Sequence, residues 1–221
     1  MTFEEHVENI KKELGIDSNL QIVCGEDGAR DYIESIRKKN PSHAKCLEDM
    51  YLKSKNTRGI YPWPVDEDLI LIKSKNYVGT LAHEMRHVWQ YKKAKDKFCW
   101  SDPCRNKLKK NLNIIIYPVS KKELDANKYA RDYCKKERME EEFNFYRWAV
   151  FEICMNRFAV LLFLIIILCT IMFPSLFFFS VVSVVSVVSV VGVVGVLMLI
   201  VTCRKKFYEE KLKSKCSLDD Q

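Results

Sequence analysis

The chain contains 221 residues, carries a net charge of +7, and 29% of its residues are charged. These charges are unevenly placed, because residues 158–203 contain no Asp, Glu, Lys or Arg. The basic residues form no cluster interleaved with aromatic residues, which excludes the usual composition of a nucleic-acid-binding surface. We therefore expect no nucleic-acid partner, and a charged soluble part of about 150 residues that can bury its own core.

Short helices and strands are predicted for the first part of the chain. Apolar residues recur at helical spacing from Phe3 to Leu14, and Gly15 follows them, which predicts a helix over residues 3–15. We then expect a strand over 20–24, a turn over 25–28, a helix over 31–39, and a helix over 42–53 that Ser42 caps.

A strand and a helix are predicted next, over the part of the chain that carries the main motif. The branched residues 69–72 predict a strand, with residues 60–61 as its partner. The free edge of such a sheet can pair with an extended substrate. In the helix that follows, Leu81, Met85 and Val88 form an apolar stripe on the side away from the two histidines of that motif.

This predicted helix contains His-Glu-x-x-His, formed by His83, Glu84 and His87. Positions i and i+4 of a helix share a face, so the two histidines can bind one ion together. Glu84 lies beside His83 and can take a proton from a water that the ion activates. Two imidazoles and a neighbouring carboxylate are what a zinc hydrolase needs, so the motif predicts zinc as the cofactor.

A third ligand is expected from a predicted helix over residues 120–136, which contains Glu123-Leu-Asp-Ala-Asn127. His-Glu-x-x-His followed some tens of residues later by Glu-x-x-Ala-Asp/Asn resembles the gluzincin-type metallopeptidases. These include membrane-integrated CAAX-prenyl endopeptidases and short intracellular peptidases that cut regulatory proteins. The resemblance covers residues 77–133 and implies that Glu123 is the third zinc ligand and that Asn127 lies beside the site. Where that family usually has a small residue inside the first motif, this chain has Met85 and Arg86.

Glu123 also has a second interpretation. Ser120-x-x-Glu123 forms a capping box, in which Ser120 caps the helix and Glu123 bonds back to the Ser120 amide. One carboxylate cannot easily do both, so the sequence leaves a ligand and a cap as alternatives. Asp125 is the other candidate ligand, but it points about 200° around the helix from Glu123, so both cannot face one metal.

The expected function is a zinc metallopeptidase that hydrolyses peptide bonds in a peptide or protein substrate, with Glu84 as the general base. An oxyanion needs a hydrogen-bond donor, for which Tyr129, Tyr133 and Arg86 are candidates. The alternative is a non-catalytic membrane hairpin protein whose soluble domain is regulatory or holds a structural zinc. A fourth protein ligand such as Cys134 would then close the site.

Residues 158–203 predict two membrane-spanning helices. One helix of these 46 residues would be about 69 Å long, against about 30 Å for the hydrocarbon core of a bilayer. Pro174 predicts the break between the two spans. Basic residues flank both ends, among them Arg157 and Arg204, and this places both termini in the cytoplasm. The nine scattered cysteines agree with a reducing compartment.

Small residues recur every three positions among the valines of the second predicted span, at Ser183, Ser186, Ser189, Gly192 and Gly195. Such residues let helices approach closely and would support a homo-oligomer. Alternatively, they are apolar filler in which the serines bond to carbonyls of their own helix.

The predicted fold class is α+β. We expect a mainly helical zincin-like metallopeptidase domain with a small sheet over residues 1–136, followed by a C-terminal transmembrane helical hairpin. A juxtamembrane helix over 137–157 joins the two, and a basic cytoplasmic tail covers 204–221. The active site is expected in the cytosol, outside the bilayer.

Overall fold

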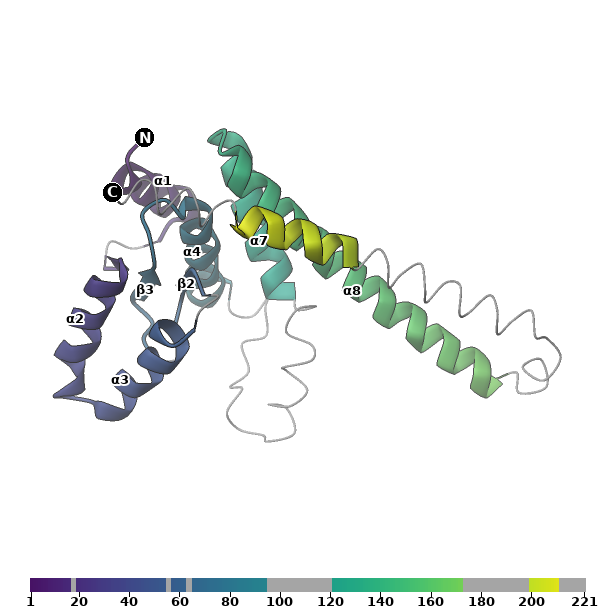
Figure 1. Ribbon diagram of the computed structural model, residues 1–221, viewed down its shortest axis with the longest axis horizontal. Coiled ribbons are helices and arrows are strands. Elements are labelled where there is room, and N and C mark those ends of the chain that lie inside the picture. The colour runs from purple at the N-terminus through teal and green to yellow at the C-terminus, as the bar shows by residue number, and fades with distance from the viewer. Residues whose placement is uncertain (17–18, 55–56, 63–64, 95–120, 173–198, 211–221) are drawn as a thin grey trace.

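Figure 1 shows the computed structural model, which describes residues 1–221 except 17–18, 55–56, 63–64, 95–120, 173–198 and 211–221. Within the described residues the fold is mainly helical α+β, with one three-stranded mixed sheet. This is the fold class that the sequence predicts for the soluble part. The helices and the sheet gather at one end of the molecule, and α8 extends away from them (Figure 1).

The first helix forms where apolar periodicity and capping residues predict it. Helix α1 covers Phe3–Leu14 and begins with a capping box. The Thr2 hydroxyl accepts a hydrogen bond from the Glu5 amide at 3.2 Å, and the Glu5 carboxylate accepts one from the Thr2 amide at 2.7 Å. Gly15 ends the helix in the left-handed conformation, with φ of 62°, which glycine adopts without steric cost.

The sheet consists of β1 (Gln21–Cys24), β2 (Gly59–Ile60) and β3 (Leu69–Ile72), in the order β1-β3-β2. Strand β1 pairs with β3 in parallel, and β2 pairs with β3 in antiparallel register, with Ile60 opposite Leu71. The prediction of a strand at 69–72 is confirmed, and its partner lies one residue earlier than expected. Strand β2 therefore forms one edge of the sheet.

Two layers of helices cover the sheet. Leu69 and Leu71 pack with residues of α2 (Glu26–Arg37) and α3 (Pro41–Leu47), and a short π-helix over Glu48–Leu52 follows α3. Ile70 and Ile72 point to the other face, where they pack with α1 and α4 (Val78–Lys93). Successive residues of a strand point to opposite faces, so the branched run of β3 supplies both halves of the core.

The start of α2 and the cap of α3 differ from the predictions. A turn over 25–28 is wrong, because Gly25 alone, with φ of 86°, turns the chain and α2 begins at Glu26. The cap of α3 is Asn40 rather than Ser42. The Asn40 side-chain oxygen accepts a hydrogen bond from the His43 amide at 3.1 Å, and Pro41 occupies the first helical position.

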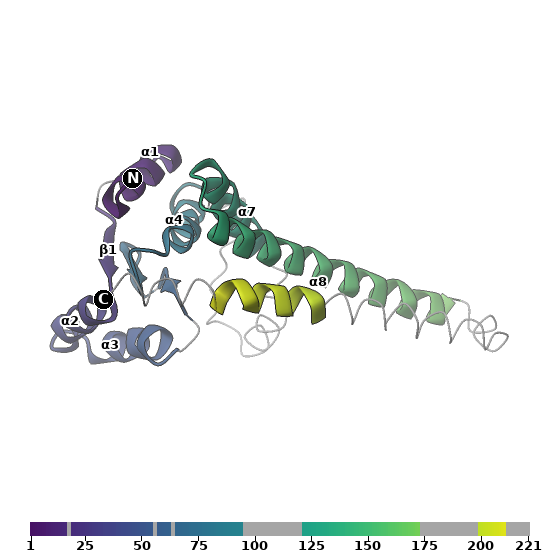
Figure 2. The ribbon, with the colours of Figure 1, turned by 45° about the horizontal axis from the view of Figure 1, so that its top comes forward.

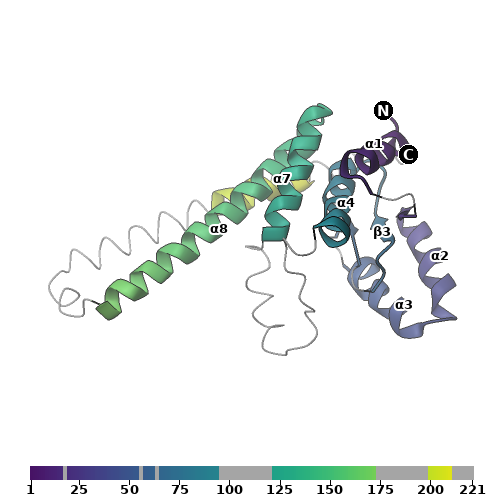
Figure 3. The same cartoon turned by 180° about the vertical axis from the view of Figure 1, so that it is seen from behind.

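Helix α4 lies between α7 (Lys121–Lys136) and the sheet, as Figure 3 shows from behind. Leu81, Met85 and Val88 of α4 are completely buried, which confirms the apolar stripe. The side chain of Tyr77, the residue directly before α4, forms no capping hydrogen bond. Instead, both carboxylate oxygens of Glu142 accept hydrogen bonds from the Gly79 amide, at 3.0 and 2.9 Å. A carboxylate stabilises the positive end of the helix dipole there. Glu142 belongs to the first turn of α8 (Glu140–Met172), so the start of α8 fixes the start of α4.

Helix α8 covers Glu140–Met172 and follows α7 after a break in which Arg138 has φ of 59°. Residues 199–210 are also helical and lie alongside α8 in Figures 1 and 2, where Lys205 forms an ion pair with Glu152 at 2.7 Å. Residue 157, where the sequence predicts that a juxtamembrane helix ends, lies inside the continuous helix α8.

The predicted membrane spans are only partly covered by the structure. Residues 158–172 belong to α8, whereas the predicted break at Pro174 and the repeat of small residues from Ser183 to Gly195 lie outside the described residues. Among the helices of the described ranges, none is both long and apolar enough to cross a membrane. The hairpin and its topology therefore stay predictions.

Candidate metal centre

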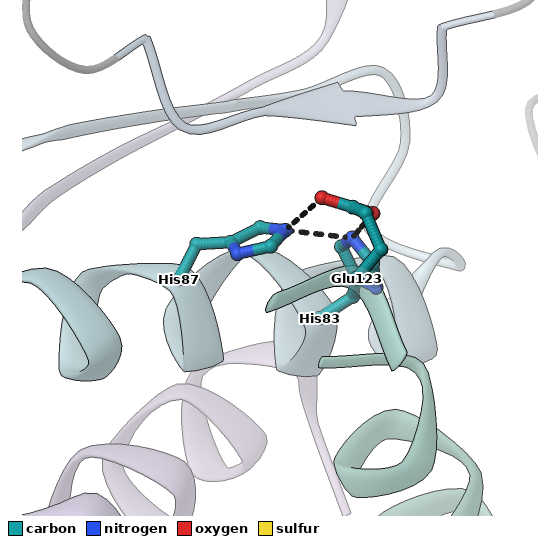
Figure 4. Close-up of side chains that lie close together, drawn as sticks. All are labelled: His83, His87 and Glu123. Carbon is teal, nitrogen blue, oxygen red and sulfur yellow. Dashed lines mark hydrogen bonds and ion pairs between the residues drawn. The ribbon is translucent and has the colours of Figure 1, made fainter. Parts of the chain in front are cut away.

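Three side chains from two helices converge on one point, as Figure 4 shows. His83 and His87 lie one turn apart on α4, and Glu123 comes from the first turn of α7. Their ligand atoms all lie within 4.8 Å of one another. Glu123 is distant from the two histidines in the sequence, and the packing of α7 on α4 brings it to them.

The spacing of the three groups fits a tetrahedral ion. The two Nε2 atoms of His83 and His87 lie 3.0 Å apart. The Glu123 carboxylate oxygens lie 3.2 Å from His87 Nε2 and 3.5 Å from His83 Nε2. Zinc bonds of about 2.0–2.1 Å at tetrahedral angles place ligand atoms about 3.3 Å apart. Two imidazole nitrogens and one carboxylate oxygen are also a donor set that zinc commonly takes.

Asp125 faces a different partner. Its carboxylate forms a bidentate ion pair with Arg86 of α4, at 2.7 and 3.2 Å, and the Arg86 guanidinium lies 3.7 Å from the centre of the Trp89 ring. Of the two acidic residues that the sequence offers as the third ligand, Glu123 is therefore the one in the triad. Ser120 lies outside the described residues, so the capping-box alternative has no described partner to compare.

Gln90 is a further residue of this region that the sequence did not suggest. It lies three residues after His87 on α4, and it is completely buried. Its side-chain oxygen lies 2.9 Å from His87 Nδ1, and its side-chain nitrogen donates to the Lys122 carbonyl at 3.0 Å and to Asp125 at 2.9 Å. The sequence contains a signal for this contact, a glutamine three residues after the second histidine, because positions i and i+3 of a helix are neighbours.

Tyr146 of α8 was also missed as part of the site. It is buried and its ring stacks on His83, with the ring centroids 6.0 Å apart and the planes at 25°. Its hydroxyl hydrogen-bonds the Thr80 hydroxyl at 3.2 Å. The pKa of Tyr146 is raised well above its usual value by burial. The uncharged Tyr146 ring therefore packs against one face of the His83 imidazole and holds its orientation.

Glu84 points to the edge of the sheet. One of its carboxylate oxygens accepts a hydrogen bond from the backbone amide of Tyr61 at 2.8 Å, immediately after β2. Burial raises the pKa of Glu84, and the nearby imidazoles of His83 and His87 oppose that rise. The Glu84 side chain thus extends from α4 to the end of the edge strand β2, and its buried surroundings increase its basicity.

Two members of the triad, His87 and Glu123, form a charged pair. Burial by itself lowers the pKa of His87, but the neighbouring Glu123 carboxylate more than compensates and raises that pKa to about 9. Burial likewise opposes ionisation of Glu123, and the two imidazoles outweigh it, so the pKa of Glu123 lies well below its usual value. The pair is thus an ionised carboxylate against a protonated imidazole, a charge arrangement that a divalent cation can replace.

The remaining candidates have contacts elsewhere. Arg86 pairs with Asp125, the Tyr129 ring lies 5.3 Å from the Arg86 guanidinium, and the Tyr133 hydroxyl hydrogen-bonds His6 at 2.9 Å. Asn127 is buried on α7, one turn after Glu123. The choice of an oxyanion donor and the role of Asn127 stay predictions.

The chain was compared with protein-family models, with curated proteins and with solved structures, and none of them matched. What defines this protein is therefore its own geometry: a mainly helical α+β fold with a His-His-Glu group that could hold a metal ion.

Proposed function

We propose that this protein is a zinc-dependent metallopeptidase. The observation that carries the proposal is the approach of the Glu123 carboxylate to both Nε2 atoms, at 3.2 and 3.5 Å, next to Glu84. The three donors would hold the ion, and a three-ligand site leaves a fourth position open. Zinc, when bound there, would act as a Lewis acid toward a peptide carbonyl and would acidify water.

Glu84 is the general base in this proposal. It is not in the triad, and its raised pKa brings it closer to the pH at which it must accept a proton. It would take the proton from the attacking water and return it to the leaving amine. The hydrogen bond from the Tyr61 amide would hold one carboxylate oxygen and leave the other for the proton transfer.

An extended peptide is the proposed substrate. Strand β2 is an edge of the sheet, and Tyr61 directly after it contacts Glu84, so a peptide paired with this edge would pass the catalytic carboxylate.

A closed structural zinc site is disfavoured by the position of Cys134. Cys134 lies eleven residues after Glu123 on α7, about 16 Å along the helix, and its sulfur packs against Gly79 in the core. Among the described residues, no fourth His, Cys, Asp or Glu joins the triad. An open site is what catalysis requires and a structural site lacks.

We further propose that the enzyme is anchored in a membrane by residues 158–203, with both termini in the cytosol. Large apolar side chains are exposed on α8 and on the helix over 199–210: Phe151, Phe158, Leu161, Leu199, Ile200 and Phe207. Exposed apolar side chains in such number favour contact with lipid. Tags at Met1 and Gln221 should both resist protease on intact cells, and opposite responses of the two tags would exclude the hairpin.

The function is tested with the full chain in detergent and a library of unstructured peptides. The parent should bind about one zinc and cleave peptides, and Glu84→Gln should keep the zinc but lose cleavage, because an amide cannot accept the proton. Glu34→Gln, at an exposed position of α2, is the matched control and should cleave like the parent. Equal cleavage by Glu84→Gln and the parent would exclude this mechanism.

A further inference from the structure

A buried amide connects the metal centre to the packing of α7 on α4. Gln90 has no exposed surface, and each of its two polar side-chain atoms has a partner. The nitrogen donates to the Lys122 carbonyl at 3.0 Å and to an Asp125 carboxylate oxygen at 2.9 Å. The oxygen lies 2.9 Å from His87 Nδ1. The contacts thus join α4 to the residue directly before Glu123.

These partners fix where the protons are. A backbone carbonyl and a carboxylate can only accept hydrogen bonds, so the NH₂ group of Gln90 must face them. Its oxygen then faces His87, and this oxygen can only accept. His87 Nδ1 must therefore carry a hydrogen and donate it to Gln90. A neutral imidazole with a hydrogen on Nδ1 has its lone pair on Nε2, which is the atom that faces Glu123 and His83.

We propose that Gln90 is a positioning residue of the metal centre: it holds His87 in the form that presents Nε2 to the ion, and it holds the start of α7 so that Glu123 completes the triad. This inference rests on the proposed metal site. Gln90 acts through His87 and Lys122 and is not itself placed at the ion.

The two histidines are supported in different ways, and the hydrogen bond between His87 and Gln90 constrains the His87 imidazole more than the ring contact of Tyr146 constrains His83. His83 Nδ1 is buried and, within the described residues, has no hydrogen-bond partner, so His83 is oriented by its stacking on Tyr146. His87 has a hydrogen bond that fixes both its ring angle and its proton. Groups that bond the outer nitrogen of a metal-binding histidine typically change metal affinity by about 10–100-fold when they are removed.

A purely structural role for Gln90 predicts a different result from a positioning role. A structural residue changes the stability of the fold, whereas a positioning residue also changes metal affinity and the proton on His87. Gln90→Met keeps most of the volume and removes all three hydrogen bonds. Val88→Ala is the matched control, because Val88 is equally buried on α4 but packs in the core away from the triad.

The experiment uses the full chain in detergent, with zinc affinity measured by competition with a chelator. Thermal unfolding is measured without metal, and the Nδ1 hydrogen of His87 is followed by NMR of ¹⁵N-histidine-labelled protein, assigned with His87→Ala. We expect Gln90→Met to bind zinc about 10–100-fold more weakly and to lose the slowly exchanging Nδ1 hydrogen. Val88→Ala should unfold at a lower temperature and retain the affinity and the signal of the parent.

The outcomes separate this inference from the proposed function. If the parent binds zinc and Gln90→Met binds it equally, or if Gln90→Met lowers only the thermal stability as Val88→Ala does, the positioning role is excluded and the metal site stands. If His83→Ala binds zinc as the parent does, the site itself is wrong, and the inference fails with it.

Discussion

Arg86 of α4 and Asp125 of α7 form a bidentate ion pair, with nitrogen-to-oxygen distances of 2.7 and 3.2 Å. The pair joins the helix of the two histidines to the helix of the third ligand. Because the two residues belong to different helices, the pair resists the separation of α4 and α7. The stacking of the Arg86 guanidinium on Trp89 at 3.7 Å holds the arginine side chain in place.

Loss of this ion pair should weaken zinc binding without removing a ligand. We expect Arg86→Met to lower the free energy of unfolding by roughly 1 kcal/mol, because the pair is partly exposed, and to lower zinc affinity several-fold through looser docking of α7. Arg131→Met removes an ion pair with the neighbouring Asp132 on the same helix α7 and is the control. Chelator competition and thermal unfolding measure both effects. Parent-like zinc affinity in Arg86→Met would show that the pair does not position Glu123.

Substitution of Glu123 should separate a ligand from a helix cap. Gln also serves in a capping box, so Glu123→Gln would cost a cap little. A ligand that loses its charge should lose most of the zinc affinity, and we expect a decrease of more than about 10-fold. Asp132→Asn, at an exposed position of α7, is the control and should bind zinc like the parent. Full zinc affinity in Glu123→Gln would assign Glu123 to the cap.

Zinc binding should release a proton from His87. In the metal-free protein the pKa of His87 is about 9, above its ordinary value of 6.5, so His87 is protonated at pH 7 and zinc must displace the proton. Zinc affinity should therefore rise about tenfold per pH unit as the pH increases toward 9. Calorimetry at pH 7 in buffers of different ionisation enthalpy counts the released protons. A binding enthalpy that is independent of the buffer would contradict the prediction.

The same group predicts the pH dependence of the metal-free fold. Because the pKa of His87 is raised on folding, its contribution to stability is fully present below pH 6.5 and is lost as the pH rises through about 9. The lowered pKa of Glu123 acts in the opposite sense, and its contribution is present above pH 4.5 and is lost in acid. Metal-free protein should thus unfold at lower temperature at pH 9 than at pH 6, and His87→Ala should lessen this difference.

Gly79 should not tolerate a side chain. A Cβ at this position would lie 2.7 Å from the Tyr146 ring and 2.8 Å from the Cys134 sulfur, both of which are buried. Gly79→Ala should therefore lower the free energy of unfolding by about 1–3 kcal/mol, as overpacking does. Gly28→Ala, also in a helix, has its nearest contact at 3.3 Å with a Val23 methyl group and should change stability far less. Equal unfolding temperatures for the two variants would exclude this packing.

Local patterns in the sequence predicted the elements that carry the triad. The spacing of His83 and His87 and the apolar stripe through Met85 predicted α4, because a helix of period 3.6 brings such positions to one face. Four branched residues predicted β3 for a similar local reason. Glu123 was predicted on a helix, but only a resemblance between motifs, and no local rule, assigned it to the metal.

Contacts between distant parts of the chain decided the rest. Tyr61 and Glu84 are 23 residues apart, Gln90 and Lys122 are 32 apart, and Gly79 and Glu142 are 63 apart. None of these pairs has a spacing that marks it in the sequence, because each depends on how helices pack and not on how one helix repeats. The sequence by itself determined which residues could bind a metal and which faces they share. Only the packing of α7 and α8 on α4 decided that Glu123 reaches the histidines, that Asp125 instead meets Arg86, and that Gln90 and Tyr146 support the two imidazoles.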